Sequence, residues 1–141
     1  MSVASSLSSL IASPHFLRRV LWLDAATGVA TGALQLLLPG FLAGLLGLPE
    51  GLLVASGWLL LGYVAGIAFI ATRQFVHAEL VWTLIAANLL WVLGCLALLF
   101  GGLVTPTLLG QVFVAVQALA VGLLAELQWF GLRKSAAQHA W

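Results

Sequence analysis

Charged residues divide the chain into long uncharged intervals, and the lengths of these intervals predict its helices. The interval between Asp24 and Glu50 holds 25 residues, and the interval between Glu50 and Arg73 holds 22. Each suits one helix across a bilayer, which takes about 20 apolar residues. The interval between Glu79 and Glu126 holds 46 residues. At about 1.5 Å per residue it is too long for one crossing and suits two helices joined by a turn.

Glycine and proline mark the turns between four predicted membrane-spanning helices. The stretch FGGLVTPT at 100–107 has the composition of a turn, and all four prolines fall between the predicted spans. The stretch FLAGLLGLP at 41–49 is too short to cross and is expected to lie along the outer interface as a short helix. The sequence therefore predicts an all-α integral membrane protein, an antiparallel four-transmembrane-helix bundle. Its predicted spans are 18–38, 52–72, 79–100 and 107–131.

These spans divide the chain into three parts. The N-terminal segment, 1–17, precedes the four-helix transmembrane domain, 18–131, and a tail follows at 132–141. The first residues, MSVASSLSSLIASP, place apolar residues at helical spacing with serines between them and contain no basic residue. This pattern is typical of a short interfacial helix, or of a segment that is disordered without lipid, and not of a secretory signal.

Composition supports a membrane location and excludes several classes of function. Hydrophobic residues make up 63% of the chain and charged residues 6%, far below the share of about 25% in a soluble domain. A formal net charge of +1, with no basic cluster, gives no indication of nucleic-acid binding. The single cysteine, Cys95, excludes an internal disulfide and is expected to be a small core residue.

The basic residues predict how the bundle is oriented. All five belong to one side of the four-span arrangement: Arg18, Arg19, Arg73, Arg133 and Lys134. The loops on the opposite side contain no Lys or Arg. Because positive charge favours the cytoplasmic side, both termini are predicted to be cytoplasmic.

Two stripes of polar and small residues follow helical spacing, one in the first span and one in the fourth. At about 100° per residue, the first stripe falls within about 40° of Asp24 and comprises Asp24, Gly28, Thr31 and Gln35. The second spreads over about 60° and comprises Gln111, Ala115, Gly122 and Glu126. Small residues let helices approach closely in lipid. The first and fourth spans are therefore predicted to pack together along these stripes.

Asp24 and Glu126 are the main candidate site residues. Asp24 follows Arg19 by five residues and Glu126 precedes Arg133 by seven, so each carboxylate lies roughly 7–10 Å inside its basic end. Two neighbouring carboxylates would share a proton, bind a cation or ligand, or be neutralised by an arginine such as Arg73. The alternative is an ion pair of each acid with a nearby arginine that only locks the bundle.

The other polar residues within the spans are expected to serve helix packing. With two glycines of the stripes, this set comprises Gln35, Asn88, Gln111, Gln117, Gly28 and Gly122. Gln117 lies opposite Glu126 on the fourth span, so it is expected to face the third span or a second copy of the protein. Tyr63 is expected to be an interior aromatic residue that forms a hydrogen bond.

No cofactor or metal is expected. The three histidines lie at or beyond the ends of the spans, so they offer no pair of facing haem ligands. No ligand spacing indicates a metal site, and no phosphate-binding loop, zinc-hydrolase pattern or catalytic triad is recognisable. An enzyme acting on a lipid or quinone therefore has the least support.

A first span followed by Pro39, a short apolar loop, LLGLP and a second span resembles small, largely uncharacterised bacterial four-helix inner-membrane proteins of the DoxX-like kind. The resemblance covers residues 18–66. It implies only a four-helix bundle in a bacterial inner membrane, and it carries no functional residue across.

Two functions fit these observations. The first is a non-enzymatic accessory or scaffold subunit that packs against a membrane-protein partner or against itself, because the short loops leave no room for a catalytic domain outside the bilayer. The alternative is a small proton- or cation-linked transporter that acts as a dimer through Asp24 and Glu126. In either function, the protein is expected to be embedded in the lipid bilayer.

Overall fold

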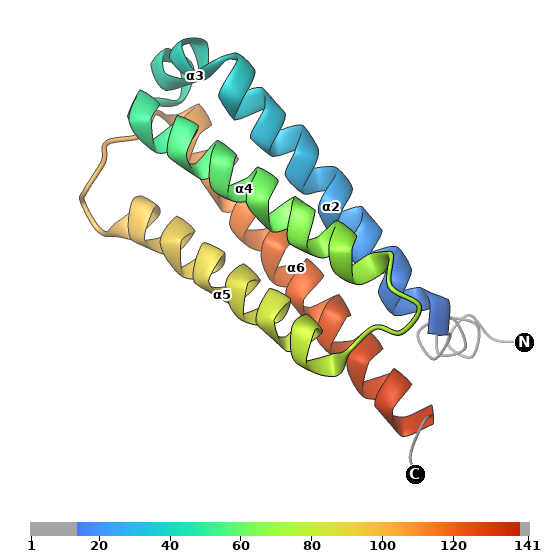
Figure 1. Cartoon of the computed structure of the whole chain (residues 1–141). Helices are drawn as coiled ribbons and strands as arrows, with labels where there is room; N and C mark the ends of the chain where they lie inside the picture. The colour runs from blue at the N-terminus through green and yellow to red at the C-terminus, as the bar shows by residue number, and fades with distance from the viewer. Residues whose placement is uncertain (1–13, 139–141) are drawn as a thin grey trace, which may run out of the picture.

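The computed structural model describes residues 14–138, which form five helices and no strand (Figure 1). The four long helices are α2 (Pro14–Leu37), α4 (Glu50–Ala71), α5 (Ala78–Phe100) and α6 (Leu108–Gln138). A short helix, α3 (Pro39–Leu46), connects α2 to α4. All four long helices are long and apolar enough to cross a membrane. The prediction of an all-α chain with four such helices is therefore confirmed.

The helix bounds differ from the predicted spans mainly at the two ends of the chain. Helix α2 begins at Pro14 and not at residue 18, since proline suits the first turn of a helix. Helix α6 continues to Gln138, past the predicted end at 131, because its polar end retains good helix formers. Residues 1–13 of the expected N-terminal segment and residues 139–141 of the tail lie outside the described residues.

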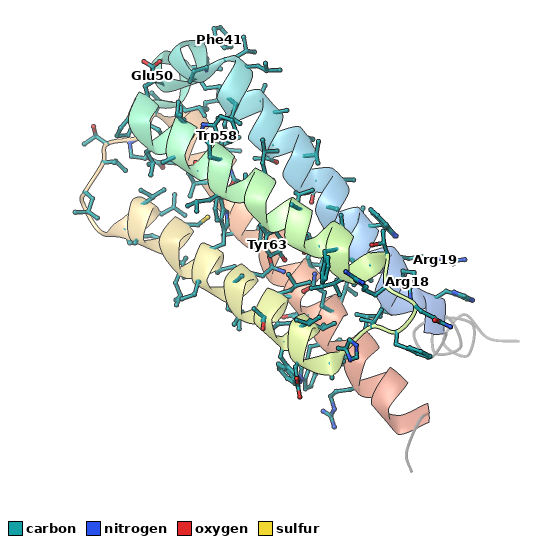
Figure 2. All side chains as sticks on the ribbon, viewed as in Figure 1. Arg18, Arg19, Phe41, Glu50, Trp58 and Tyr63 are labelled. Carbon is teal, nitrogen blue, oxygen red and sulfur yellow. The ribbon has the colours of Figure 1, made fainter. Side chains whose placement is uncertain are left out.

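The long helices form an antiparallel bundle in which each runs opposite to the next along the chain (Figure 1). The described chain begins and ends at the same end of the bundle, which we call the terminal end; α3 lies at the other, the α3 end. Arg18 and Arg19 lie at the terminal end, and Phe41 and Glu50 at the α3 end (Figure 2).

The bundle consists of two helix pairs that meet unevenly. Helix α2 packs along α4, and α5 packs along α6. Contacts between α2 and α6 join the pairs, as predicted for the first and fourth spans, whereas α4 and α5 touch very little. One side of the bundle is therefore closed, and the side between α4 and α5 is loosely packed.

Small residues bring α2 and α4 together on the closed side. A Cβ atom at Gly28 would lie 2.6 Å from Cγ2 of Val64 on α4. A Cβ atom at Gly57 would lie 2.9 Å from Cγ of Leu36 on α2. Larger side chains at either glycine would force the helices apart, so α4 is held against α2 and away from α5.

The α3 end is closed by hydrogen bonds between the end of α3 and the start of α6. Gly47 ends α3 with φ 69°, in the left-handed region that favours glycine. The Thr107 backbone N–H donates to the carbonyl oxygen of Leu46 (2.9 Å), and the Thr107 hydroxyl donates to that of Leu45 (2.9 Å). This clamp holds α3 across the end of the bundle.

Most of the buried apolar residues form three clusters, and these clusters lie toward the two ends of the bundle. Two clusters occupy the terminal end: Leu21, Ala25, Ile67, Ile70, Ala71 and Leu84, and Leu17, Val81, Ile85, Ala125 and Leu132. The third occupies the α3 end: Leu42, Leu46, Leu48, Leu53, Cys95 and Val114. The middle of the bundle, between these clusters, contains the site described next.

Candidate functional site

The candidate site is centred on the carboxylate of Asp24, which is 4% exposed. Its Oδ2 atom accepts hydrogen bonds from the Tyr63 hydroxyl (2.7 Å), Asn88 Nδ2 (3.3 Å) and Gln128 Nε2 (2.6 Å). The four residues come from α2, α4, α5 and α6 respectively, so each long helix contributes one side chain. We call this group the Asp24 cluster.

Hydrogen bonds within the Asp24 cluster satisfy its members. Besides its bond to Asp24, Asn88 Nδ2 donates to Oε1 of Gln128 (3.2 Å). Three donors converge on one oxygen of Asp24, and a carboxyl oxygen can accept such bonds through its lone pairs. A polar group buried among apolar helices is destabilising unless it is bonded in this way. The cluster therefore joins the four helices at one level.

The second carboxylate oxygen of Asp24, Oδ1, remains accessible. The donors from Tyr63, Asn88 and Gln128 all go to Oδ2, and within residues 14–138 no donor is bonded to Oδ1. Within the same residues, no fully buried side-chain nitrogen or oxygen lacks a hydrogen-bond partner. Oδ1 therefore keeps a small accessible area, and Asp24 is among the residues that line the cavity described next.

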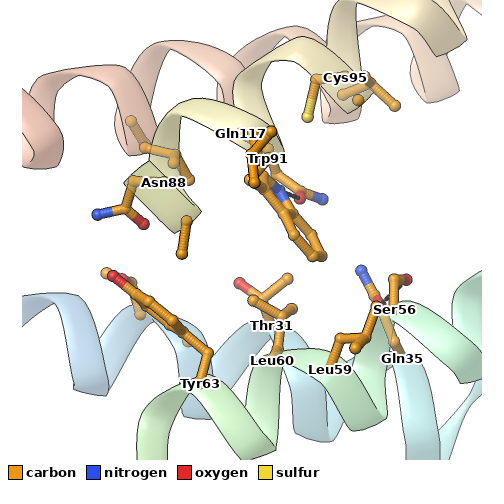
Figure 3. A pocket seen from close by; sticks show the side chains of 18 of the residues that line it. Thr31, Gln35, Ser56, Leu59, Leu60, Tyr63, Asn88, Trp91, Cys95 and Gln117 are labelled. Carbon is orange, nitrogen blue, oxygen red and sulfur yellow. Dashed lines mark hydrogen bonds between the residues drawn. The ribbon is translucent and has the colours of Figure 1, made fainter. Parts of the chain in front are cut away.

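This cavity lies in the middle of the bundle and has a volume of about 620 Å³. All four long helices line it, mostly with apolar side chains, and Figure 3 shows Tyr63 and Asn88 on opposite walls at one part of it. Its volume falls within the range of small-molecule sites, about 300–1,000 Å³. An apolar cavity with a few converging polar groups is typical of a ligand-binding site.

Two further polar pairs line the cavity nearer the α3 end. The Ser56 hydroxyl donates to Oε1 of Gln35 (2.8 Å), and Trp91 Nε1 donates to Oε1 of Gln117 (3.1 Å). The indole ring of Trp91 extends from α5 toward α2 and α4 (Figure 3). The cavity thus has a carboxylate toward the terminal end, neutral polar pairs along its length, and apolar residues toward the α3 end.

The cavity reaches the outside of the bundle between α4 and α5. Leu59 on α4 and Leu90 on α5 both line it, and each is 67% exposed. Gly94 on α5 also lines it, and a Cβ atom there would meet nothing within 4 Å. The loosely packed side of the bundle is therefore the side on which the cavity opens.

The structure corrects the expected pairing of Asp24 with Glu126. Glu126 is exposed, whereas Gln128, two positions further along α6, points inward to Asp24. Gln111, from the same predicted stripe as Glu126, is also exposed. Helix α6 therefore turns the Gln117 and Gln128 face inward, opposite to the face expected. The reason is that α6 is apolar around most of its circumference, so its hydrophobic pattern does not fix its rotation.

Sequence reasoning missed Gln128, although a signal for it exists. Gln117 and Gln128 are eleven residues apart, which at about 100° per residue places them within about 20° on one helix face. Gln117 was expected to lie opposite Glu126, and its bond to Trp91 places it toward α5. Extending that face by three turns would have reached Gln128.

The arginines do not neutralise Asp24, since its three donors are uncharged side chains. The Arg18 guanidinium donates to the backbone carbonyl oxygens of Ala71, Arg73 (2.9 Å) and Gln74 (3.5 Å), and so caps the end of α4. The side chain of Arg73 is exposed, and its guanidinium carbon lies 3.9 Å from the centre of the Phe69 ring. Arg73 is therefore not part of the Asp24 cluster.

The residues expected to serve helix packing occupy different places. Gln35, Asn88 and Gln117 each bond to a side chain on another helix, as described above. Gly28 packs against α4, and a Cβ atom at Gly122 would lie 3.9 Å from Val92 on α5. Gln111 differs: its Nε2 donates only to the carbonyl oxygen of Pro106 (3.5 Å), just before its own helix.

Within residues 14–138, no three His, Cys, Asp or Glu side chains are grouped in a way that could hold a metal ion.

Comparison of the chain with protein-family models, with curated proteins and with solved structures finds no match. The resemblance to DoxX-like proteins over residues 18–66 has no support from these comparisons. The function is therefore argued from the Asp24 cluster and the cavity alone.

Proposed function

We propose that this chain is a non-enzymatic membrane protein that binds an amphipathic small molecule in the cavity between its four long helices. The observation that carries the proposal is a mostly apolar cavity of about 620 Å³ with the buried Asp24 carboxylate among its lining. Interiors of purely structural bundles are filled by side chains. Ionisable groups within membrane spans are functional candidates by default.

The chemistry of the lining favours binding over catalysis. Asp24 is held by three donors and Trp91 by Gln117, so these side chains have fixed positions. Hydroxyl and amide groups on an apolar wall orient a ligand and select among ligands, which is the usual division of roles in small-molecule sites.

We further propose that the terminal end faces the cytoplasm, since all five basic residues of the sequence belong to that end. Helix α3 would then lie along the outer interface, where an apolar helix of 8 residues fits. A bacterial inner membrane is the location that the DoxX-like resemblance implies.

Blocking the mouth of the cavity tests the proposal. Gly94→Phe places a ring where a Cβ atom meets nothing within 4 Å. Leu93→Phe is the matched control, because Leu93 is 60% exposed and is not among the lining residues. Protein purified in native lipid would be released into a mass spectrometer, and bound molecules would be identified by mass. We expect one bound species on the wild type and on Leu93→Phe, and its loss from Gly94→Phe.

Two outcomes would contradict the proposal. In the first, the wild-type protein carries only lipids, and Leu93→Phe and Gly94→Phe carry the same lipids in equal amounts. The other is a bound species that Gly94→Phe retains in full, which would place it outside the cavity. Thermal unfolding of both variants shows whether any loss comes from misfolding.

Self-association, or packing against a membrane partner, is the second candidate. Gly62 and Gly66 lie one turn apart on α4, both exposed, and a Cβ atom at either would meet nothing within 4 Å. Such a face lets another helix approach closely in lipid. We expect Gly62→Leu to separate a dimer or a co-purified partner, measured by mass in lipid nanodiscs. A wild-type protein that is strictly monomeric and purifies alone would contradict this role.

A carrier remains the alternative within the binding function. The transporter predicted from the sequence used two carboxylates, Asp24 and Glu126. Because Glu126 is exposed, only Asp24 remains for this role. A carrier would bind its cargo at Asp24 and release it on the other side of the bilayer, which Asp24→Asn would abolish in reconstituted vesicles. Unchanged transport in Asp24→Asn would exclude this version.

A further inference from the structure

The chemical class of the ligand can be narrowed by the charge of the cavity. The lining side chains all lie in the described part of the chain, and among them Asp24 is the only carboxyl group, with no Lys, Arg or His. Its bonded partners, Tyr63, Asn88 and Gln128, are neutral. A negative charge in a low-dielectric interior attracts a cation and repels an anion far more strongly than it would in water.

We propose that the cavity binds an amphipathic cation, an alkylammonium-type molecule whose head group meets Oδ1 of Asp24 and whose apolar tail extends toward the α3 end. This inference rests on the binding function proposed above and specifies its ligand. Asp24 is 4% exposed, and its Oδ1 atom has no bonded donor within residues 14–138. The head group of the ligand would bind to this oxygen.

Aromatic side chains next to the Asp24 cluster suit such a head group. The hydroxyl of Tyr63 is bonded to Asp24, so the Tyr63 ring is fixed beside the carboxylate. Trp91 lies one turn after Asn88 on α5 and extends across the cavity (Figure 3). Cations bind to the faces of Trp and Tyr rings, and quaternary ammonium groups are commonly recognised in this way.

The length of the cavity suits a single alkyl chain. On α2 its lining runs from Asp24 to Gln35, eleven residues apart, which corresponds to about 16 Å of helix. Beyond Gln35 the lining is apolar and includes Leu48, Leu53 and Val114. An extended dodecyl chain is of comparable length, so with its head at Asp24 its tail would reach the level of Gln35, where the apolar part of the lining begins.

The packing of the bundle indicates that the ligand enters from the lipid. At the α3 end the cavity is closed by the Thr107 clamp and the buried cluster around Leu46. At the terminal end it is closed by the Asp24 cluster and the buried residues around Leu21. The opening that remains lies between α4 and α5, at Leu59 and Leu90. A molecule that passes there must first partition into the bilayer, as an alkylammonium with a long tail does, with its tail in the acyl region and its head near the interface.

Cys95 provides a direct measure of occupancy. It is the only cysteine of the protein, and it is buried and lines the cavity. Its alkylation by N-ethylmaleimide would be followed in nanodiscs with dodecyltrimethylammonium, dodecanol or dodecyl sulfate. The tails match and only the heads differ. The partitioning of each probe into nanodiscs without protein would be measured first, so that the three probes are compared at equal concentrations in the membrane.

We expect dodecyltrimethylammonium to slow the alkylation of Cys95 about tenfold more than dodecanol does, and dodecyl sulfate to have no effect. In Asp24→Asn, which keeps the shape and removes the charge, the cation should protect no better than the alcohol. Glu126→Gln, which removes the exposed carboxylate, is the matched control and should behave as the wild type. The comparison of head groups on the wild type stands even if Asp24→Asn does not fold.

A cross-link tests the lateral opening. The variant would carry Leu59→Cys and Leu90→Cys in a Cys95→Ala background, and a bis-maleimide would join the two new cysteines. The exchange of radiolabelled dodecyltrimethylammonium would then be measured. We expect the cross-link to slow exchange about tenfold, while each single-cysteine variant treated with the same reagent exchanges normally. Unchanged exchange in the cross-linked protein would overturn the lateral route.

The outcomes separate this inference from the proposed function. Equal protection by dodecanol and dodecyltrimethylammonium, or protection by dodecyl sulfate, would overturn the cationic ligand and leave the cavity as a binding site. If none of the three probes protects Cys95 and no bound species is lost in Gly94→Phe, the binding function itself is overturned.

Discussion

Asp24 and Glu126 belong to two helices that contact each other, α2 and α6, and the sequence places them at similar depths, yet their surroundings differ. Asp24 is 4% exposed and accepts hydrogen bonds from three other helices. Glu126 is exposed, and the neighbouring Gln128 takes the inward place. The two residues share an acidic side chain and a similar depth along the bundle. They differ in the direction in which each side chain points, and the rotation of each helix about its own axis sets that direction.

The difference has a physical consequence for each carboxylate. Asp24 is removed from water and relies on bonds from Tyr63, Asn88 and Gln128, and hydrogen bonds to a charged group are stronger than those between neutral groups. Glu126 is exposed on α6 and lies outside the Asp24 cluster. Substitutions at the two acids should therefore differ in both stability and binding.

Removing the carboxylates separately should give the largest contrast. Asp24→Ala removes the acceptor of three donors, of which Asn88 keeps a second bond to Gln128 while Tyr63 and Gln128 lose their bonded acceptor. Each unsatisfied buried donor costs about 1–3 kcal/mol. We expect a loss of about 3 kcal/mol or more in the free energy of unfolding for Asp24→Ala, and a change within about 0.5 kcal/mol for Glu126→Ala. Reversible unfolding by sodium dodecyl sulfate in mixed micelles measures both. Equal losses would show that the Asp24 cluster does not hold the helices together.

Moving the second carboxylate inward should give the next largest effect. The double variant Glu126→Gln with Gln128→Glu keeps the composition and net charge and creates the pair of acids that the sequence predicted. It replaces a donor 2.6 Å from Asp24 Oδ2 by a like charge. We expect a loss of about 2 kcal/mol in the free energy of unfolding. The single variant Glu126→Gln is the control and should be neutral, and a neutral double variant would contradict the inward placement of Gln128.

The two helices also differ in how much of their orientation could be predicted from the sequence. On α2 the polar and small residues Asp24, Gly28, Thr31 and Gln35 fall on one face, and the structure places all four beside the cavity. On α6 two faces carry polar residues, one with Glu126 and one with Gln128. Apolar residues suit lipid as well as a protein interior, so the rest of α6 does not decide between these faces.

The four helices could be predicted because their lengths and boundaries depend on charge and on turn residues. The cavity could not, because it depends on the distance between α4 and α5. That distance follows from contacts between residues far apart in the sequence: Gly28 and Gly57 draw α4 toward α2, and Thr107 fixes α3 against α6. No local pattern records such contacts.

Removing a single donor from the Asp24 cluster should give the smallest of the three effects. Tyr63→Phe keeps the ring and removes the hydroxyl that donates to Asp24 Oδ2 at 2.7 Å, while Asn88 and Gln128 still donate. We expect a loss of about 1.5 kcal/mol in the free energy of unfolding, the lower end of the range for a hydrogen bond to a charged group. Thr83→Val is the control, because the exposed Thr83 hydroxyl bonds only to the carbonyl oxygen of Glu79 within its own helix.

The same pair of variants separates stability from ligand binding. If the Tyr63 hydroxyl only supports the carboxylate, Tyr63→Phe should leave the protection of Cys95 by dodecyltrimethylammonium nearly unchanged, since the ring and Oδ1 of Asp24 remain in place. If the hydroxyl also orients Asp24 toward the cavity, protection should weaken while protection by dodecanol stays the same. A loss of stability in Tyr63→Phe no larger than in Thr83→Val would contradict a hydrogen bond from Tyr63 to Asp24 that stabilises the bundle.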